Sequence, residues 1–252
     1  MTRKIVVIAV VTGALGVLAF GTVNRTLANY DAGPSLYGGI GNGQSAVQVD
    51  IDRASLLETL PLGTLNQEEV DALQFMLEEE KLARDVYTSL YTSWSLPVFQ
   101  NIAASEQTHM DAVEALLERY EITPLASTQA GVFVNQDLQA LYTQLIAQGS
   151  QSIEDALLVG GAIEEIDILD LQERIAQTDQ EDIRTVFENL ERGSYNHLNA
   201  FATNYSRQTG NDYQPQYLSA EAYQDILANT GGNAGGLGGR GRGRNGGGQG
   251  RP

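Results

Sequence analysis

The chain of 252 residues contains no cysteine. Disulfide bonds and thiolate metal sites are therefore both excluded, and any bound metal must be held by oxygen and nitrogen atoms. Side-chain imidazoles are also scarce, since His109 and His197 are the two histidines of the chain. These absences leave carboxylates as the main source of metal ligands.

Basic residues are few, with 15 Lys and Arg against 32 Asp and Glu and a net charge of −17. All the acidic residues lie between Asp31 and Asp225, whereas seven of the basic ones lie outside that segment. Such a surface repels nucleic acid and attracts cations, so we expect no nucleic-acid partner. Solubility alone is a sufficient reason for most of the exposed carboxylates.

The N-terminal segment has the pattern of an export signal. Arg3 and Lys4 precede an uncharged apolar run over residues 5–20, and small and polar residues follow as far as Ala28. We therefore predict a signal over residues 1–28 and an exported protein, periplasmic, extracellular or at the cell surface. The alternative is an uncleaved N-terminal membrane anchor, because the length of the apolar run lies at the edge of the spanning range.

Two further segments have compositions that do not build a core. Residues 29–65 are rich in Gly, Ser and Asn and predict a flexible lead, with a short helix around 54–60. Residues 229–252 combine many glycines with four arginines and predict a disordered tail. In an acidic, exported protein we expect this tail to contact the acidic body or an anionic surface, or to serve only solubility.

The segment between them, residues 66–228, shows helical periodicity throughout. Asn66 followed by Glu69 is typical of a capping box and starts a first helix that reaches about residue 91. Further helices are predicted over about 98–120, 152–177 and 180–205, with a short one around 138–145 in the long connection and another at 220–227. Four long helices with one long crossover predict an all-α, ferritin-like four-helix bundle.

Several polar residues occupy apolar positions in these helices. Glu80 takes a place where a leucine is expected, whereas Glu78 and Glu79 fall mainly outside that stripe. Glu106 and His109 share one face of the second helix because they are three residues apart. The third and fourth helices contribute Glu164 with Asp167, and His197.

A lone buried glutamate or histidine is more often hydrogen-bonded than metal-bound, and Glu164 is ambiguous because Glu165 adjoins it. The combination of both histidines with carboxylates from the other helices makes a dense negative cluster that needs positive charge. We therefore predict divalent metal, with carboxylates able to bridge two ions. Two irons match best, and manganese, a mixed pair or zinc would satisfy the same ligands.

Four blocks then carry a resemblance to a known family. EKLARDVY at 80–87, EQTH at 106–109, EEID at 164–167 and SYNH at 194–197 are similar to the helix motifs of the ferritin-like di-iron carboxylate superfamily. The chain resembles its erythrin and rubrerythrin branch, and within it an uncharacterised ferritin-like domain family, over residues 66–205. The fourth block has Ser194 where that branch has a glutamate, and the third has Asp167 where it has a second glutamate.

The resemblance implies a redox centre that reacts with peroxide, oxygen or ferrous iron. Its metal ligands would be Glu80, Glu106, His109, Glu164 and His197, with Asp167 as a sixth ligand or a neighbour of the ligands. Tyr87 would be a hydrogen-bonding or electron-transfer residue, or alternatively a core tyrosine. Ser194 removes one carboxylate, so Asp167 compensates, one of the two ions binds weakly, or the site holds one metal.

The resemblance leaves the reaction partners open. Because the chain lacks a rubredoxin-like cysteine module, electrons would come from an unknown external donor or from ferrous iron itself. A homodimer is compatible with the family. Two other functions remain as alternatives: a non-catalytic metal-binding or scavenging protein, and a cell-surface structural module that retains the bundle.

Overall fold

The computed structural model describes residues 57–230, and every regular element among these residues is a helix. The predicted signal or anchor, most of the lead and nearly all of the tail lie outside this range. Within it, no helix is long and apolar enough to cross a membrane. The elements are α2 (Gln67–Trp94), α3 (Pro97–Arg119), α4 (Gln136–Gly149), α5 (Ile153–Gln177), α6 (Glu181–Thr209) and α7 (Ala220–Thr230).

The helix ends follow the sequence signals closely. The Asn66 side chain accepts hydrogen bonds from the backbone N–H groups of Glu68 and Glu69, and the Glu69 side chain accepts one from the Asn66 N–H, which completes the predicted capping box. Pro97 occupies the first turn of α3, where its missing N–H costs nothing. The helix α6 continues past the predicted end at residue 205, because its stop signal is Gly210 with a φ of 77°.

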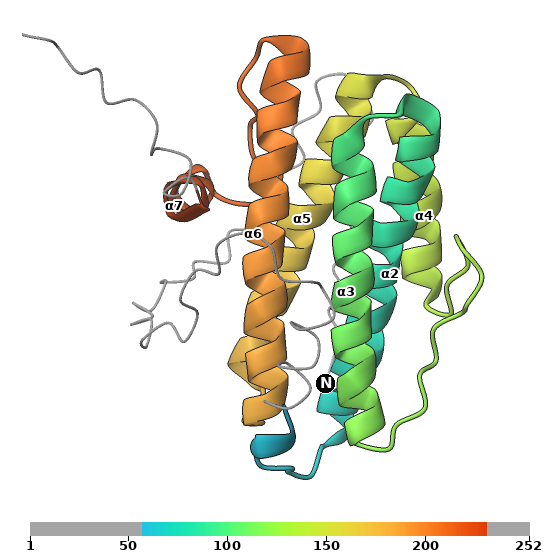
Figure 1. Ribbon diagram of the computed structural model, residues 1–252, viewed down its shortest axis with the longest axis vertical. Coiled ribbons are helices and arrows are strands. Elements are labelled where there is room, and N and C mark those ends of the chain that lie inside the picture. The colour runs from blue at the N-terminus through green and yellow to red at the C-terminus, as the bar shows by residue number, and fades with distance from the viewer. Residues whose placement is uncertain (1–56, 231–252) are drawn as a thin grey trace, which may run out of the picture.

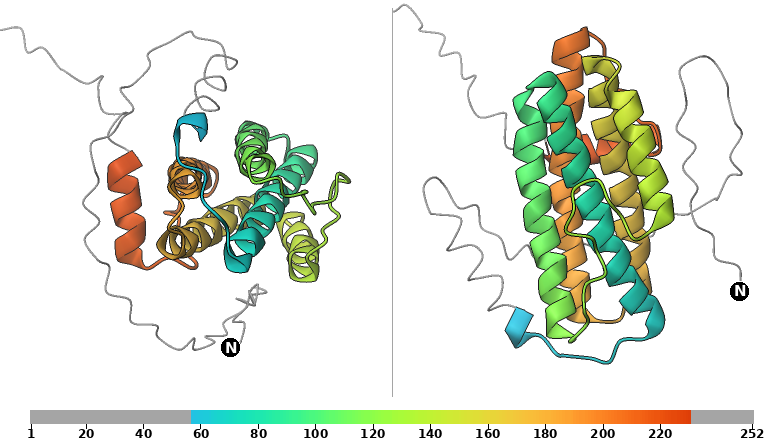
Figure 2. Two further views of the ribbon diagram at one scale, coloured as in Figure 1. Left: turned by 90° about the horizontal axis from the view of Figure 1, so that it is seen from below. Right: turned by 90° about the vertical axis from the view of Figure 1, so that its right-hand side faces the viewer.

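Four long helices, α2, α3, α5 and α6, form a bundle (Figure 1). The helix α2 packs mainly on α3, and α5 packs mainly on α6. As predicted, the long crossover between α3 and α5 contains a short helix, α4, which lies outside the bundle against α2 and α5, while α7 lies against α6 on the opposite side (Figure 2). The helical bundle predicted from the sequence is therefore confirmed.

The helices α2 and α5 run antiparallel. Tyr87 contacts Glu164 near one end of their interface, and Glu69 contacts Thr178 near the other. Later residues of α2 thus meet earlier residues of α5, which fixes the register of the polar side chains between them.

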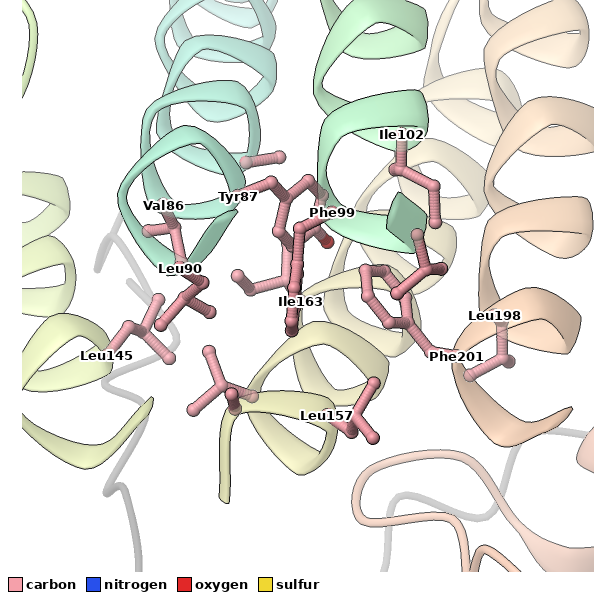
Figure 3. Packing of buried hydrophobic residues seen from close by; sticks show 14 of the residues in the cluster. Val86, Tyr87, Leu90, Phe99, Ile102, Leu145, Leu157, Ile163, Leu198 and Phe201 are labelled. Atoms are coloured by element: carbon pink, nitrogen blue, oxygen red, sulfur yellow. The ribbon is translucent and has the colours of Figure 1, made fainter. Parts of the chain in front are cut away.

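The apolar core is split into two clusters. One contains the rings of Tyr87, Phe99 and Phe201, whose centroids lie 5.1–6.4 Å apart (Figure 3). The other surrounds Phe187 and Met110 near the opposite end of the bundle. Each of the four long helices contributes side chains to both clusters and carries its polar, metal-capable residues between them. A layer of buried acids and histidines therefore crosses the middle of the bundle.

The expectation that Glu78 and Glu79 lie mainly outside the buried side of α2 is wrong, since they are only 5% and 6% exposed. The crossover covers this side of the helix. Glu78 accepts hydrogen bonds from the N–H groups of Val134 and Asn135, at 2.6 and 2.7 Å. The acidic side chain thereby satisfies backbone donors at the start of α4, which an amphipathic stripe on α2 alone does not reveal.

A buried lysine fixes the same loop. Lys81 is 1% exposed, forms an ion pair with Asp85 at 2.6 Å, and donates to the carbonyl groups of Gln129 and Val132. Asp85 in turn accepts from the Gly131 N–H. The charges compensate each other inside the protein, and they hold the crossover on α2 beside the polar layer.

Candidate metal centre

All six predicted metal ligands lie in the polar layer. Each is at most 8% exposed, and together they come from all four long helices: Glu80 from α2, Glu106 and His109 from α3, Glu164 and Asp167 from α5, and His197 from α6. Residues 117 positions apart in the chain thus reach one site. The structure brings the predicted set together without exception.

Glu106 is the centre of the arrangement. One of its oxygens lies 2.8 Å from Nδ1 of His109, and the other lies 2.8 Å from Nδ1 of His197. The two imidazole rings stack at 5.3 Å. His109 also approaches Glu80 at 3.2 Å, and His197 approaches Glu164 at 3.4 Å. Each histidine is therefore flanked by Glu106 and by one further glutamate.

Several of these atoms are buried without a hydrogen bond: Glu80 Oε1, Glu106 Oε1, Asp167 Oδ1 and His197 Nδ1. Glu106 Oε1 and His197 Nδ1 lie 2.8 Å apart and form an ion pair when His197 is protonated. Ligands at right angles around a metal, each about 2.1 Å from it, are separated by about 3 Å. The separation is therefore compatible with two ligands of one ion as well as with an ion pair.

The donor set fits a divalent metal. Glu106, His109 and His197 each offer one ligand atom, and these atoms all lie within 4.8 Å of one another. Imidazole nitrogen with carboxylate oxygen suits iron, manganese and zinc alike. The structure thus supports a possible metal site at these three residues, while its metal and the number of ions stay predictions.

A small cavity adjoins the cluster. The cavity is about large enough to hold one water molecule. Its polar walls are five carboxylates, from Glu79, Glu80, Glu106, Glu164 and Asp167. Leu138 and Leu141 of α4 are among its apolar walls. So many acids around one small cavity need compensating positive charge.

The pKa values show how protons supply that charge in the absence of metal. Burial raises the pKa of Glu80 to about 7, although His109 opposes the shift. Burial acts to lower the pKa of His197, but Glu106 and Glu164 outweigh it and raise that pKa to about 10. Burial acts to raise the pKa of Glu106, but the two imidazoles outweigh it and bring that pKa well below the ordinary value. A metal ion must therefore displace protons from the histidines.

Metal affinity is expected to rise with pH. Because the pKa of His197 is raised to about 10, its proton is still bound at pH 8, and each proton displaced per ion changes the apparent affinity roughly tenfold per pH unit. We expect Co²⁺ to bind roughly a hundredfold more tightly at pH 8 than at pH 6. Calorimetric titration in buffers of different ionisation enthalpy would measure both the affinity and the released protons. A pH-independent affinity without proton release would contradict this arrangement.

Tyr87 combines the two roles considered for it. Its ring packs in the apolar cluster, and its hydroxyl donates to Oε1 of Glu164 at 2.5 Å while lying 3.3 Å from the carbonyl oxygen of Gly160. The bond engages one oxygen of Glu164, so that Oε2 faces His197. Tyr87 is thus a core residue that orients a candidate ligand.

Ser194 is tied to Asp167. The Ser194 hydroxyl lies 2.5 Å from Oδ2 of Asp167, which leaves Oδ1 of that buried carboxylate without a hydrogen bond. Asp167 therefore has an oxygen available on the cavity wall. Such an oxygen is needed if Asp167 is to replace the glutamate that is missing at position 194.

Other residues at the site were missed by sequence reasoning. A Cβ atom at Gly193 would lie 2.5 Å from Nε2 of His109, so glycine leaves room for the imidazole. Ser105 Oγ lies 2.9 Å from Nε2 of His197 and fixes the far side of that ring. Gly193 adjoins Ser194, and Ser105 adjoins Glu106. Both residues could have been found from the sequence by considering the immediate neighbours of the motif residues.

The structure resolves the ambiguity between Glu164 and Glu165. Glu164 faces the cavity, whereas Glu165 accepts hydrogen bonds from the N–H groups of residues 216–218 and from the Tyr213 hydroxyl. Glu165 is completely buried and is not among the residues that line the cavity. It holds the segment after α6 against α5.

Comparison with known proteins places the chain among uncharacterised relatives. It is 48% identical over 178 residues to the uncharacterised protein MJ0754 of Methanocaldococcus jannaschii, and the match covers 69% of this chain and 94% of that protein. The crystal structure of hypothetical protein MJ0754 aligns with a TM-score of 0.65, at 48% identity, over 68% of this chain and 97% of that one. Residues 69–230 match the family described as "Uncharacterized protein domain (DUF2202)". The matched range includes every candidate ligand, and the chain belongs to the DUF2202 family.

Proposed function

We propose that the chain is a ferritin-like metal-binding protein that holds two divalent ions, with iron as the best match. It acts as a non-haem oxidoreductase on peroxide, oxygen or ferrous iron. The observation that carries the proposal is the convergence of buried ligand atoms without hydrogen bonds from four helices, three of whose residues, Glu80, Glu106 and Asp167, line one small cavity. This arrangement resembles the ferritin-like di-iron proteins, in which carboxylates and E-x-x-H histidines project into the bundle.

The proposal of two ions rests on the symmetric surroundings of the two histidines. Glu106 approaches His109 with one oxygen and His197 with the other, as a bridging carboxylate would. Glu80 stands on the His109 side, and Glu164 stands on the His197 side. Each half thus has one imidazole, one glutamate of its own and a share of Glu106. Asp167 adds a further oxygen on the cavity wall.

Bound iron would supply the electron transfer, and the chain's own residues would control the surroundings. Tyr87 orients Glu164 through its hydroxyl, and Ser105 and Glu106 orient His197. The apolar walls from α4 exclude bulk water from the cavity beside the candidate ligands. Electrons come from an external donor or from ferrous iron as substrate.

A second candidate function is metal binding or scavenging without turnover. The net charge of −17 favours it, since an acidic surface gathers cations, and so does a cavity with space for only about one water molecule. Retention of metal without any reaction with peroxide would select this function. A cell-surface structural module that needs no metal is the remaining candidate.

The proposed location rests on the N-terminal sequence pattern, and the proposed partners rest on the net charge. The basic pair and apolar run before Ala28 support export or attachment to a membrane. The acidic composition supports cations rather than nucleic acid as partners. A homodimer is also proposed, and only the resemblance to the ferritin-like family supports it.

The deciding experiment is metal analysis of the full chain purified without chelator, followed by its absorption spectrum after peroxide addition. We expect about two irons per chain and a new ferric charge-transfer band, as two-metal carboxylate sites of this type provide. The His109→Ala variant should lose both, whereas Glu114→Gln, at an exposed position of the same helix, should keep both. Unchanged metal content in His109→Ala would refute this ligand assignment, and a folded protein that refuses iron would favour the structural candidate.

A further inference from the structure

Glu79 is a buried acid that the proposed ligand set does not use. It is 6% exposed, it lines the cavity, and its Oε2 atom has no hydrogen-bond partner. Burial and the neighbouring carboxyl group of Asp170 on α5 both raise the pKa of Glu79. Two carboxyl groups cannot bond to each other directly unless a proton or a cation lies between them.

The position of this pair relative to the cavity is set by the antiparallel register of α2 and α5. Glu79 precedes Glu80 on α2, and Asp170 lies one turn of α5 beyond Asp167, so both are displaced from the ligands in the same direction. Asp170 is partly exposed, whereas Asp167 is buried. Oxygen atoms thus extend from the surface, through Asp170 and Glu79, to the carboxylates of the cavity.

The residues around Glu79 and Asp170 favour a cation that passes between the two acids over one that stays bound to them. Arg174 stacks over the ring of Phe75 at 4.7 Å and interacts electrostatically with both Glu79 and Asp170. A nearby guanidinium weakens the hold of two carboxylates on a cation. Around the cavity itself, Leu138 and Leu141 of α4 present apolar surface, which offers a cation no ligands.

We propose that Glu79 and Asp170 form a transit site at which a hard divalent cation exchanges water for carboxylate oxygens before it enters the buried cavity. The inference rests on the proposed metal-binding function. Hard cations prefer oxygen ligands, and carboxylates that attract an approaching cation raise its association rate by roughly 10 to 10³-fold. The pair therefore governs the rate of loading, while the six ligands govern the final occupancy.

The test is the rate at which Co²⁺ enters the metal-free full chain, followed by stopped-flow absorbance. Glu79→Gln and Asp170→Asn, which keep the side-chain shapes, should slow loading at least about tenfold and leave the final Co²⁺ content unchanged. Glu114→Gln removes one exposed carboxylate from α3 and should load at the unaltered rate. Circular dichroism and thermal melting would establish that each variant is folded.

The outcomes separate the transit site from the metal site itself. Folded variants that load as fast as the unaltered chain would overturn the transit site, since the two acids would then only share a proton. A lower final Co²⁺ content with an unchanged rate would also overturn it, because Glu79 would be a ligand. An unaltered chain that binds no Co²⁺ would overturn the proposed function instead.

Discussion

Replacement of Glu106 by glutamine is expected to weaken divalent-metal binding by at least about a hundredfold, with little change in fold. Loss of residues that merely orient metal ligands typically costs 10- to 100-fold in affinity, and Glu106 contacts both histidines directly at 2.8 Å. Glutamine keeps the shape but offers one neutral oxygen in place of two charged ones. It cannot bridge two ions as a carboxylate does.

Thermal melting with and without metal measures this effect. For the unaltered chain, Co²⁺ at about a thousand times its dissociation constant should stabilise the fold by about 4 kcal/mol, and a hundredfold weaker site retains only about 1.4 kcal/mol of that. Glu114→Gln, the matched replacement at an exposed position on α3, should respond to Co²⁺ like the unaltered chain. An equal stabilisation of the Glu106 variant would place the metal elsewhere.

The clustering of the candidate ligands could be predicted from the sequence because its signal is local to each helix. Glu80 and His109 stand out as ionisable residues on apolar stripes, and the spacing between Glu106 and His109 already puts both on one face. The site then follows from the packing of four helices with their stripes inward. The buried positions of the six residues agree with this reasoning.

The outer side of α2 could not be predicted in the same way. Glu78 and Lys81 are buried by the crossover, whose path depends on how residues 120–135 return along the bundle. No periodicity within α2 encodes that path, because the partners are backbone groups more than 45 residues away. Glu79 was misassigned for a related reason, since its environment is created by α5 and the cavity together.

Glu164 and Glu165 show where helical periodicity reaches its limit. Adjacent residues on a helix point about 100° apart, and both directions are buried here, one toward the bundle axis and the other toward residues 213–218. The sequence places Glu164 on the apolar stripe but leaves it ambiguous, because Glu165 adjoins it. The return of the chain after α6 separates their roles.

Replacement of Glu165 by alanine is therefore expected to reduce the free energy of unfolding by about 3 kcal/mol, because hydrogen bonds to a buried charged group are strong and their donors are left unpaired. The donors are the N–H groups of Gln216, Tyr217 and Leu218 and the hydroxyl of Tyr213, at 2.6–2.8 Å. Metal content should stay unchanged, since Glu165 does not face the cavity.

The adjacent replacement, Glu164→Gln, should have the opposite profile. The metal-free protein should change in stability by less than about 1 kcal/mol, because glutamine keeps the shape of Glu164 and an oxygen that accepts from the Tyr87 hydroxyl. Metal binding should fall, since Glu164 Oε2 faces His197. Urea denaturation of metal-free protein with metal analysis of each variant measures both quantities. Loss of metal on replacement of Glu165, with Glu164→Gln still loaded, would reverse the two assignments and with them the register of α5 at the site.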